Sequence, residues 1–350
     1  MTIVRTITAA ELADGAVETS ILGTGATLPE PVLIVELDGA NTRVAAAAAT
    51  RVPTLDKLVI GRCAGPVPAG LASLTAALDL TYAVGPDPTD RAVVGADDID
   101  TALAEFVERV ARYPQAALIA GQVVRISETL PVPEAIDIES LAYSTLQGGA
   151  EFRGWLEQRR HLDRPLPPPA ADPVLIDRDG DILHITLNRP DRRNAYGTAL
   201  RDALVDALRL PLLDDTIAKI VLAGAGPSFC AGGDLDEFGH APDTATAHLI
   251  RTRGGAGRLV ARLADRMEVR LHGHCVGAGI EIPAFAGSVI ATPDTVFRLP
   301  EVTMGLLPGA GGTVSLPRRI GRWRALHLFV TGSALEARRA LEWGLIDEIV

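Results

Sequence analysis

Cysteine is scarce in this sequence. Among the 350 residues there are three cysteines, Cys63, Cys230 and Cys275, and no two of them form a C-x-x-C pair. That spacing argues against a zinc site or a disulfide framework. An odd number of cysteines, with no secretion signal at the N-terminus, fits a reducing cytoplasm. We therefore expect three separate thiols and no bound metal.

Lysine and long apolar runs are also rare. Lys57 and Lys219 are the only lysines, so arginine supplies almost all the positive charge, and the formal net charge is -11 with a pI of about 5.2. A protein this acidic has no overall attraction for nucleic acid or anionic membranes. The longest apolar stretch, residues 277–291, contains Glu281 and is too short to span a bilayer. These features predict a soluble cytoplasmic protein that binds neither nucleic acid nor membrane.

Aromatic residues make up only 4% of the chain, so the core must come from the aliphatic residues of its 47% hydrophobic fraction. In the first half, residues 32–37 and 58–60 are short β-branched runs typical of buried strands. Residues 99–112 have apolar side chains at helical spacing, and Tyr113-Pro114 is expected to end that helix. Residues 117–119 form a third predicted strand. Alternation of strands and helices predicts parallel βα units in an α/β fold.

A proline-rich segment divides the chain. Residues 164–172 (RPLPPPAAD) contain four prolines and no periodicity, which predicts a linker between domains at 1–163 and 173–350. Before it, residues 138–159 are predicted to be helical with a break at Gly148-Gly149. The first 30 residues show no clear period and are expected to form a poorly ordered arm.

The second half repeats the pattern of the first. Residues 182–187, 220–222 and 268–271 are predicted strands, and residues 196–208 a helix. Three segments of the first half match three of the second in the same order. VLIVEL matches ILHITL, LDKLVIGRCAGP matches IAKIVLAGAGPS, and FVERVARYPQAALIAGQ matches LVARLADRMEVRLHGHC. The identities are few, so the first half is either a degenerate copy of the second or an ordinary α/β stretch.

Two glycine-rich turns and two acids carry the candidate chemistry. FCAGGDL at 229–235 and HGHCVGAGIE at 272–281 each follow a predicted strand, where free backbone N–H groups can bind an oxyanion. Glu281 and Glu301 both lie in apolar surroundings, and buried carboxylates are usually paired or functional. One interpretation is a buried salt bridge to Arg298 or Arg270, and the other is an acid/base site.

Four motifs in the second half point to one family. The motifs are LNRPDRRNA at 187–195, FCAGGDL, HGHCVGAGIE and LPEVTMGLLPGAGGT at 299–313. Their order and spacing resemble those of the crotonase (enoyl-CoA hydratase/isomerase) superfamily. The resemblance covers residues 171–350, about half the chain. It implies the ββα spiral core of that family and a substrate that is an acyl-CoA thioester.

The resemblance also implies roles for individual residues. The backbone N–H groups of Gly233 and Ala278 would bind the thioester oxygen and stabilise the enolate-like charge that develops on it. Glu281 would activate water for attack at C3, and Glu301 would protonate C2. Together these roles describe an enoyl-CoA hydratase or dehydratase.

Further family features concern coenzyme A and assembly. The segments around Ala195 and Ala231 resemble those that contact the adenine and pantetheine parts of coenzyme A, which belongs to the substrate, so no separate cofactor is expected. Asp234 is interpreted as a structural cap. His272 and His274 are interpreted as hydrogen-bonding or packing residues, although His274 could face the acyl group. Members of the family usually form trimers or dimers of trimers, so the resemblance predicts a homo-oligomer.

The sequence departs from the family at two places, Ala278 and the end of the sequence, and Gly309 separates it from particular relatives. Ala278 replaces the middle glycine of the usual turn, which would matter if a positive φ were needed there. Gly309 stands where related hydrolases and dienoyl isomerases place an Asp, which favours water addition or loss. The sequence ends at residues 345–350, where relatives continue into a helical segment that covers the acyl pocket, and we expect residues 139–160 to take its place.

Other functions remain open at this point. The same enolate chemistry serves isomerases, hydrolases and decarboxylases. A non-catalytic acyl-CoA-binding subunit is a further alternative, although two buried glutamates argue against it.

Overall fold

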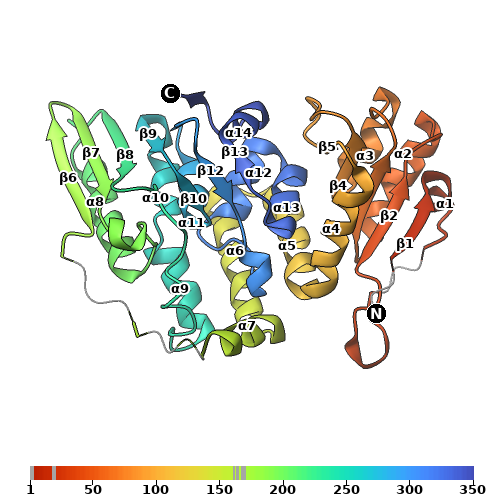
Figure 1. Ribbon diagram of the computed structural model, residues 1–350, viewed down its shortest axis with the longest axis horizontal. Helices are drawn as coiled ribbons and strands as arrows, with labels where there is room; N and C mark the ends of the chain where they lie inside the picture. The colour runs from red at the N-terminus through yellow and green to blue at the C-terminus, as the bar shows by residue number, and fades with distance from the viewer. Residues whose placement is uncertain (1–3, 18–20, 161, 163–164, 167–170) are drawn as a thin grey trace.

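Two β-sheets stand at opposite ends of the molecule, with helices between them, in the computed structural model of Figure 1. The structure describes residues 4–17, 21–160, 162, 165–166 and 171–350. The mixed α/β class predicted from the sequence is confirmed. Most of the predicted linker at 164–172 lies outside the described residues, so the domain boundary stays a prediction.

The sheet of the first half has five parallel strands in sequential order. The strands and the helices that connect the first four are β1 (Arg5–Thr8), α1 (Ala9–Ala13), β2 (Val32–Glu36), α2 (Thr42–Arg51), β3 (Leu58–Cys63), α3 (Ala72–Ala77), β4 (Leu80–Val84) and β5 (Val93–Ala96). The predicted strands at 32–37 and 58–60 correspond to β2 and β3. The prediction of a poorly ordered N-terminal arm is wrong for β1 and α1. Only Ile7 of β1 is buried, so this edge strand leaves no alternating pattern to recognise.

Four helices follow the first sheet: α4 (Ile99–Arg112), α5 (Pro114–Ser127), α6 (Val132–Gln147) and α7 (Ala150–Arg160). α4 and the break at Gly148-Gly149 agree with the sequence. The strand predicted at 117–119 is wrong, because these residues lie inside α5. A short apolar run fits a buried helix as well as a buried strand, and Pro114 begins α5 because proline suits the first helical position.

The second half contains a six-stranded sheet in the order β14-β11-β9-β8-β7-β6 and a small sheet in the order β10-β12-β13. The strands are β6 (Val174–Asp179), β7 (Ile182–Leu187), β8 (Lys219–Gly224), β9 (Met267–Leu271), β10 (His274–Val276), β11 (Ser288–Ala291), β12 (Val296–Arg298), β13 (Leu335–Glu336) and β14 (Glu348–Ile349). The helices are α8 (Thr198–Leu213), α9 (Thr244–Gly254), α10 (Gly257–Arg262), α11 (Ala278–Glu281), α12 (Gly312–Ile320), α13 (Arg322–Thr331) and α14 (Ala337–Trp343). β7, β8, β9 and α8 were predicted from the sequence.

Duplication of the two halves is not confirmed. The first sheet is parallel throughout, whereas β6 and β7 of the second sheet are antiparallel. Residues 106–122 lie in α4 and α5, but their supposed counterpart at 259–275 includes β9. A degenerate copy therefore stays a hypothesis for the first half.

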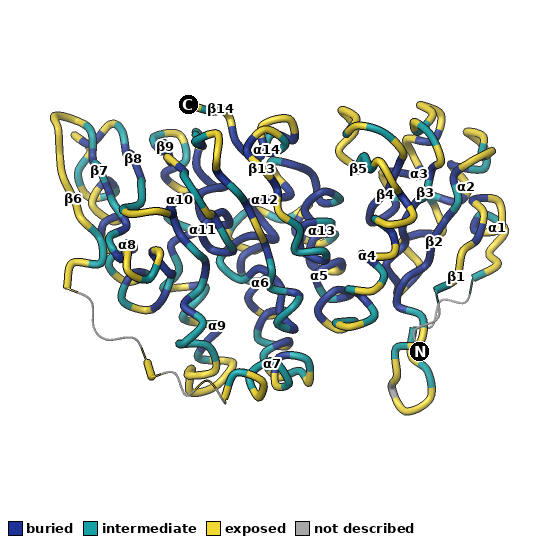
Figure 2. The backbone as a smooth tube through the Cα atoms, viewed as in Figure 1, coloured by how far each residue is buried: buried dark blue, intermediate teal, exposed yellow. Residues whose placement is uncertain are grey.

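Of the two buried hydrophobic clusters among the described residues, one spans both halves and the other lies within the first half. Phe106 of α4 and Phe329 of α13 belong to the same buried cluster. Tyr82 Oη of β4 lies 2.7 Å from His327 Nδ1 of α13, and Ser127 Oγ of α5 donates to the Thr313 carbonyl at 2.8 Å. Figure 2 shows buried backbone running through the helices between the sheets. The packing places α5 and α6 against the second half.

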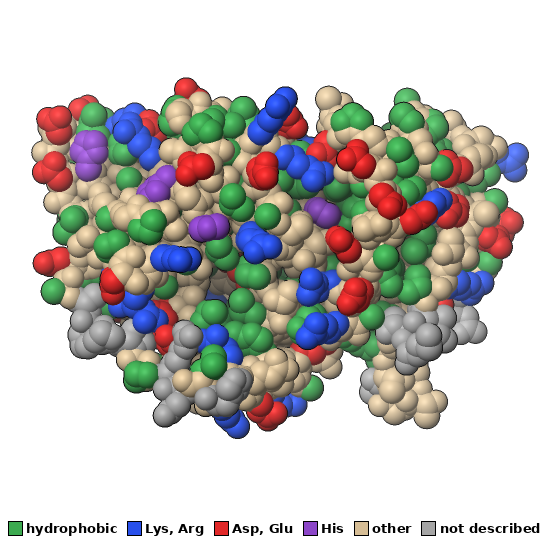
Figure 3. All heavy atoms as spheres, in the orientation of Figure 1, with side chains coloured by type: hydrophobic (Ala, Val, Ile, Leu, Met, Phe, Trp, Pro, Cys, Tyr) green, Lys and Arg blue, Asp and Glu red, His purple; other side chains and the backbone are tan. Residues whose placement is uncertain are grey.

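The surface mixes charges of both signs. On the face shown in Figure 3, acidic and basic side chains are interspersed without a broad patch of either. Across the described residues, no helix has the length and apolar character that crossing a bilayer would require.

Candidate active site

A cavity of about 560 Å³ lies between α6 of the first half and the region of α8, α9 and α11 in the second. Glu281, Glu301, Gly233 and Ala278 all line it, so the structure brings these four predicted residues together. Much of the remaining wall is apolar and comes from both halves, including Ile136, Tyr143, Phe238, Ala247 and Ile250. The helical segment expected at 139–160 to cover the pocket contributes α6 to this wall.

Two backbone N–H groups at the cavity lack acceptors. Those of Gly233 and Ala278 donate to no backbone or side-chain acceptor in the part of the chain that the structure describes. The positive φ that this turn needs falls on Gly277, at +48°, and Ala278 is the first residue of α11. An alanine at 278 is therefore compatible with the turn, and its N–H remains free because a helix offers no internal acceptor to its first N–H groups.

Glu281 is held by the start of α12. Glu281 is the last residue of α11 and is only 2% exposed. Glu281 Oε2 accepts hydrogen bonds from the N–H groups of Ala310 at 2.7 Å and Gly312 at 2.9 Å. Burial raises the pKa of Glu281 to about 7, against the opposing effect of these two hydrogen bonds. Its carboxyl group can therefore accept or release a proton near neutral pH.

Glu301 begins the short 3-10 helix Glu301–Met304, beside Gly277. Its Oε2 atom is enclosed and has no hydrogen-bond partner among the described residues. Burial, and next the charge of Glu281, raise the pKa of Glu301 well above its usual value. A Cβ atom on Gly277 would lie 2.4 Å from Glu301 Oε1 and 3.6 Å from Glu281 Oε1, so both carboxylates occupy the space beside this glycine.

The salt-bridge interpretation of these acids is wrong. Arg270 pairs instead with Glu268, at 2.7 Å. Neither Glu281 nor Glu301 forms an ion pair with any described residue, and Arg298 contributes none. The two carboxylates therefore lie in the cavity wall without a compensating cation in contact.

A third buried acid comes from the first half and was not identified from the sequence. Glu139 of α6 is 1% exposed and accepts hydrogen bonds from the N–H groups of Gly311 at 2.7 Å and Thr313 at 2.8 Å, and from Thr313 Oγ1 at 2.7 Å. Burial, and next Glu281, raise the pKa of Glu139 to about 8. A glutamate on the apolar face of the predicted helix at 138–159 was the available signal.

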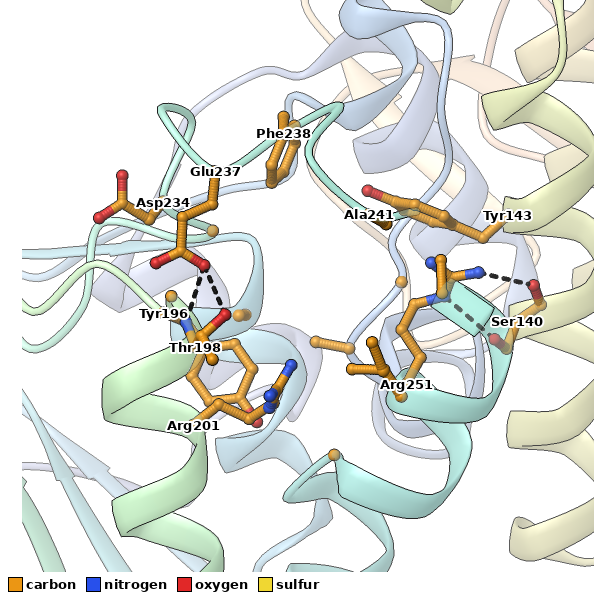
Figure 4. A pocket seen from close by; sticks show the side chains of 18 of the residues that line it. Ser140, Tyr143, Tyr196, Thr198, Arg201, Asp234, Glu237, Phe238, Ala241 and Arg251 are labelled. Carbon is orange, nitrogen blue, oxygen red and sulfur yellow. Dashed lines mark hydrogen bonds between the residues drawn. The ribbon is translucent and has the colours of Figure 1, made fainter. Parts of the chain in front are cut away.

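Arg251 and Tyr143 form a second feature that the sequence did not indicate. Figure 4 shows both on one side of the cavity with Ser140, facing Thr198 and Glu237 on the other side. The Arg251 guanidinium lies 4.4 Å from the centre of the Tyr143 ring, and its Nε donates to Ser140 Oγ at 3.0 Å. The Tyr143 ring also fills the space next to Gly309, where a Cβ atom would approach it to 2.3 Å.

A smaller basic pocket of about 400 Å³ adjoins Ala231. Its basic lining residues are Arg109, Arg193, Arg298 and His274, and no acidic residue lines it. None of the three arginines forms an ion pair within the described residues. His274 therefore faces this pocket and not the cavity with the glutamates. Ala195, the other residue predicted to contact coenzyme A, is 8% exposed and lines neither pocket.

The remaining candidates have structural contacts. Asp234 is buried and pairs with Arg192, with Nη2 to Oδ1 at 2.6 Å. His272 Nε2 lies 2.9 Å from the Gly226 carbonyl. Cys230 and Cys275 are buried neighbours in an isolated β-bridge, and both thiols are free. Among the described residues there is no group of His, Cys, Asp and Glu side chains arranged to bind a metal ion.

Residues 177–350 match the family model described as enoyl-CoA hydratase/isomerase. The chain is 36% identical to the 1,2-epoxyphenylacetyl-CoA isomerase of Escherichia coli (strain K12), over 51% of this chain and 69% of that protein. It is 34% identical to the 2,3-dehydroadipyl-CoA hydratase of the same strain, over 50% of this chain and 68% of that protein. The crystal structure of an enoyl-CoA hydratase from Thermoplasma volcanium GSS1 is 34% identical and has a TM-score of 0.47, over 51% of this chain and 72% of that one.

Proposed function

Because the chain belongs to the enoyl-CoA hydratase/isomerase family, we propose that it adds water to, or removes water from, the C2–C3 bond of an acyl-CoA thioester. One observation carries the proposal. Two free N–H groups and two carboxylates without a paired cation line the same cavity. Exposed or paired groups would cost less free energy at these positions, so their convergence favours a reaction site.

In this mechanism the thioester oxygen lies between the N–H groups of Gly233 and Ala278. Glu281 takes a proton from water, whose oxygen bonds to C3, while the C2–C3 π electrons move toward the thioester oxygen. The two N–H groups stabilise the resulting enolate, and each is worth on the order of 3 kcal/mol in such sites. Glu301 then donates a proton to C2, which completes the 3-hydroxyacyl product. Dehydration runs through the same steps in reverse.

We assign the coenzyme A end of the substrate to the basic pocket beside Ala231. Arg109, Arg193 and Arg298 offer positive charge to the phosphates of coenzyme A without competition from an acidic neighbour. The acyl group then extends past Gly233 into the larger, mainly apolar cavity. Ala195 does not line this pocket, and its N–H donates to the Arg192 carbonyl, one position before Arg193 in the chain.

Isomerisation is the second candidate, favoured by the high proton affinity of two neighbouring glutamates. Such a pair can move a proton between C2 and C4 through the same enolate. The hydratase name of one Escherichia coli relative matches the first candidate, whereas the isomerase named in the other acts on an epoxide and does not bear on the C2–C4 proton shift. We retain homo-oligomerisation, as a trimer or hexamer, as a further proposal.

Product analysis in water labelled with a heavy oxygen isotope separates the alternatives. Hydration of a 2-enoyl-CoA places the label on C3 and leaves the thioester intact, and this is the expected result. Hydrolysis would place it in a free carboxylic acid and release coenzyme A. Isomerisation of a 3-enoyl-CoA would incorporate no label, and that outcome without any C3 labelling would replace hydration with isomerisation as the function.

A further inference from the structure

Four successive N–H groups at the start of α12 alternate between two carboxylates. The N–H groups of Ala310 and Gly312 donate to Glu281. Those of Gly311 and Thr313 donate to Glu139. All four N–H groups belong to one continuous backbone segment. A displacement of that segment changes the hydrogen bonds of both carboxylates at once, so Glu281 and Glu139 share one backbone support.

The helix itself provides no substitute for these glutamates. The first N–H groups of an α-helix have no acceptor within the helix, and α12 has no side-chain cap of its own. Its N-cap is Gly311, at φ +108°, a conformation that glycine adopts readily. Glu281 from α11 and Glu139 from α6 together bind the N–H groups that have no acceptor within the helix, and both side chains are almost fully buried.

Glu139 therefore links the first half of the chain to the acid/base pair of the second. It is separated from Gly311 by 172 positions in the sequence, and Thr313 Oγ1 gives it a third donor. Replacing Glu139 with alanine would leave the buried N–H groups of Gly311 and Thr313 without acceptors. The N–H groups that bind Glu281 lie in the same backbone segment.

We propose that Glu139 is a positioning residue for the reaction: by binding two N–H groups of the 310–313 segment, it fixes the orientation in which the other two hold Glu281. The catalytic consequence rests on the proposed function, whereas the coupling between the two carboxylates does not. The first half thus contributes part of the active-site geometry in addition to covering the acyl pocket.

Amide proton chemical shifts test the coupling directly in the full-length protein. The informative signals are those of Ala310 and Gly312, because these N–H groups are bonded to Glu281 and not to position 139. In Glu139→Ala we expect both signals to move upfield as their hydrogen bonds to Glu281 lengthen. If only the signals of Gly311 and Thr313 move, the carboxylates act separately and the proposal is overturned.

The chain offers a matched control. Glu151 of α7 also binds the start of another helix, accepting from the N–H groups of Gln115 at 2.7 Å and Ala116 at 3.0 Å at the beginning of α5. Glu151→Ala should leave the Ala310 and Gly312 signals in place. If Glu139→Ala does not fold, the isosteric pair Glu139→Gln and Glu151→Gln replaces it, and the same signals should move in the first variant alone, because a Gln amide oxygen can accept only part of the bonds made by Glu139.

Steady-state kinetics test the catalytic consequence. In Glu139→Ala we expect kcat to fall by roughly tenfold or more while KM changes less than about threefold, with part of kcat restored in Glu139→Gln. A loss that lies wholly in KM, or equal kcat values for the variant and wild type, would overturn the positioning role. If wild type converts no substrate but the amide signals respond as expected, the proposed function fails and the coupling stands.

Discussion

Glu301 lies directly against Gly277, where a Cβ atom would stand 2.4 Å from Glu301 Oε1. The φ of +48° at this glycine also starts the turn that frees the Ala278 N–H. A single backbone position therefore controls one proposed acid and one proposed oxyanion donor.

Gly277→Ala should inactivate the enzyme. The new methyl group would displace the Glu301 carboxylate, and a misplacement of about 1 Å can cost roughly a hundredfold in rate. The assay is kcat for hydration of a 2-enoyl-CoA. Gly180→Ala is the matched control, because Gly180 has φ +61° but open space around its Cβ position. The control should lose about 1 kcal/mol of stability and keep its kcat, and an active Gly277→Ala would contradict the proposed geometry.

The pH dependence of kcat/KM should show an acidic limb near pH 7. Glu281 must be ionised to accept a proton from water, and burial raises its pKa to about 7. Activity should therefore fall about tenfold for each pH unit below this value. Burial, and next the charge of Glu281, raise the pKa of Glu301 well above its usual value, which favours the protonated carboxyl group that the proposed acid requires. A profile that is flat between pH 5 and 8 would be incompatible with Glu281 as the base.

Protein stability should decrease as the pH rises, and Glu139 should cause part of that decrease. Its pKa is raised in the folded protein from 4.5 to about 8, so its contribution is fully present below the lower value and is lost as the pH rises through the upper one. We expect the urea midpoint of Glu139→Gln to fall less than that of wild type across this window. The groups that face this site are Glu281, Glu301, Tyr143 and Arg251.

Glu108→Gln serves as the control for that measurement, since Glu108 is exposed on α4. Its urea midpoint should follow that of wild type at every pH. Parallel curves for Glu139→Gln and wild type would show that Glu139 titrates alike in the folded and unfolded chain.

Arg298→Gln should weaken binding of coenzyme A thioesters without slowing the chemical step. Arg298 lines the basic pocket, where no acidic residue does, and its replacement would remove the charge-assisted contact with phosphate that we propose. We expect KM to rise roughly tenfold for the CoA substrate and to stay unchanged for the same acyl group on N-acetylcysteamine, which lacks the phosphates. Arg338→Gln, on the surface of α14, is the control. Equal effects on both thioesters would place coenzyme A elsewhere.

Much of the second half could be predicted from sequence because its motifs are local. Three of the four short segments that carry the family resemblance contain Gly233, Ala278, Glu281 and Glu301, and the structure places these residues around one cavity. The sequence left open whether the turn needs a positive φ at Ala278, which an alanine adopts poorly. The structure shows that the positive φ belongs to Gly277.

The rest of the site depends on tertiary packing. Glu139 reaches the 310–313 segment only after α6 packs against the second half, and no local pattern encodes a contact across 172 positions. The error at 117–119 has a related cause. α5 is enclosed by other elements, so its apolar side chains no longer follow the one-sided period of a surface helix.

The most direct test of the acid/base pair is the rate at which purified protein removes the absorbance of a 2-enoyl-CoA, for wild type, Glu281→Gln and Glu301→Gln. The panel of substrates should run from short-chain to cyclic and aromatic acyl groups. We predict that wild type hydrates at least one of them and that each variant loses roughly a hundredfold or more in kcat, with thioester binding retained. Hydration by both variants at the wild-type rate would contradict the central role of these two glutamates.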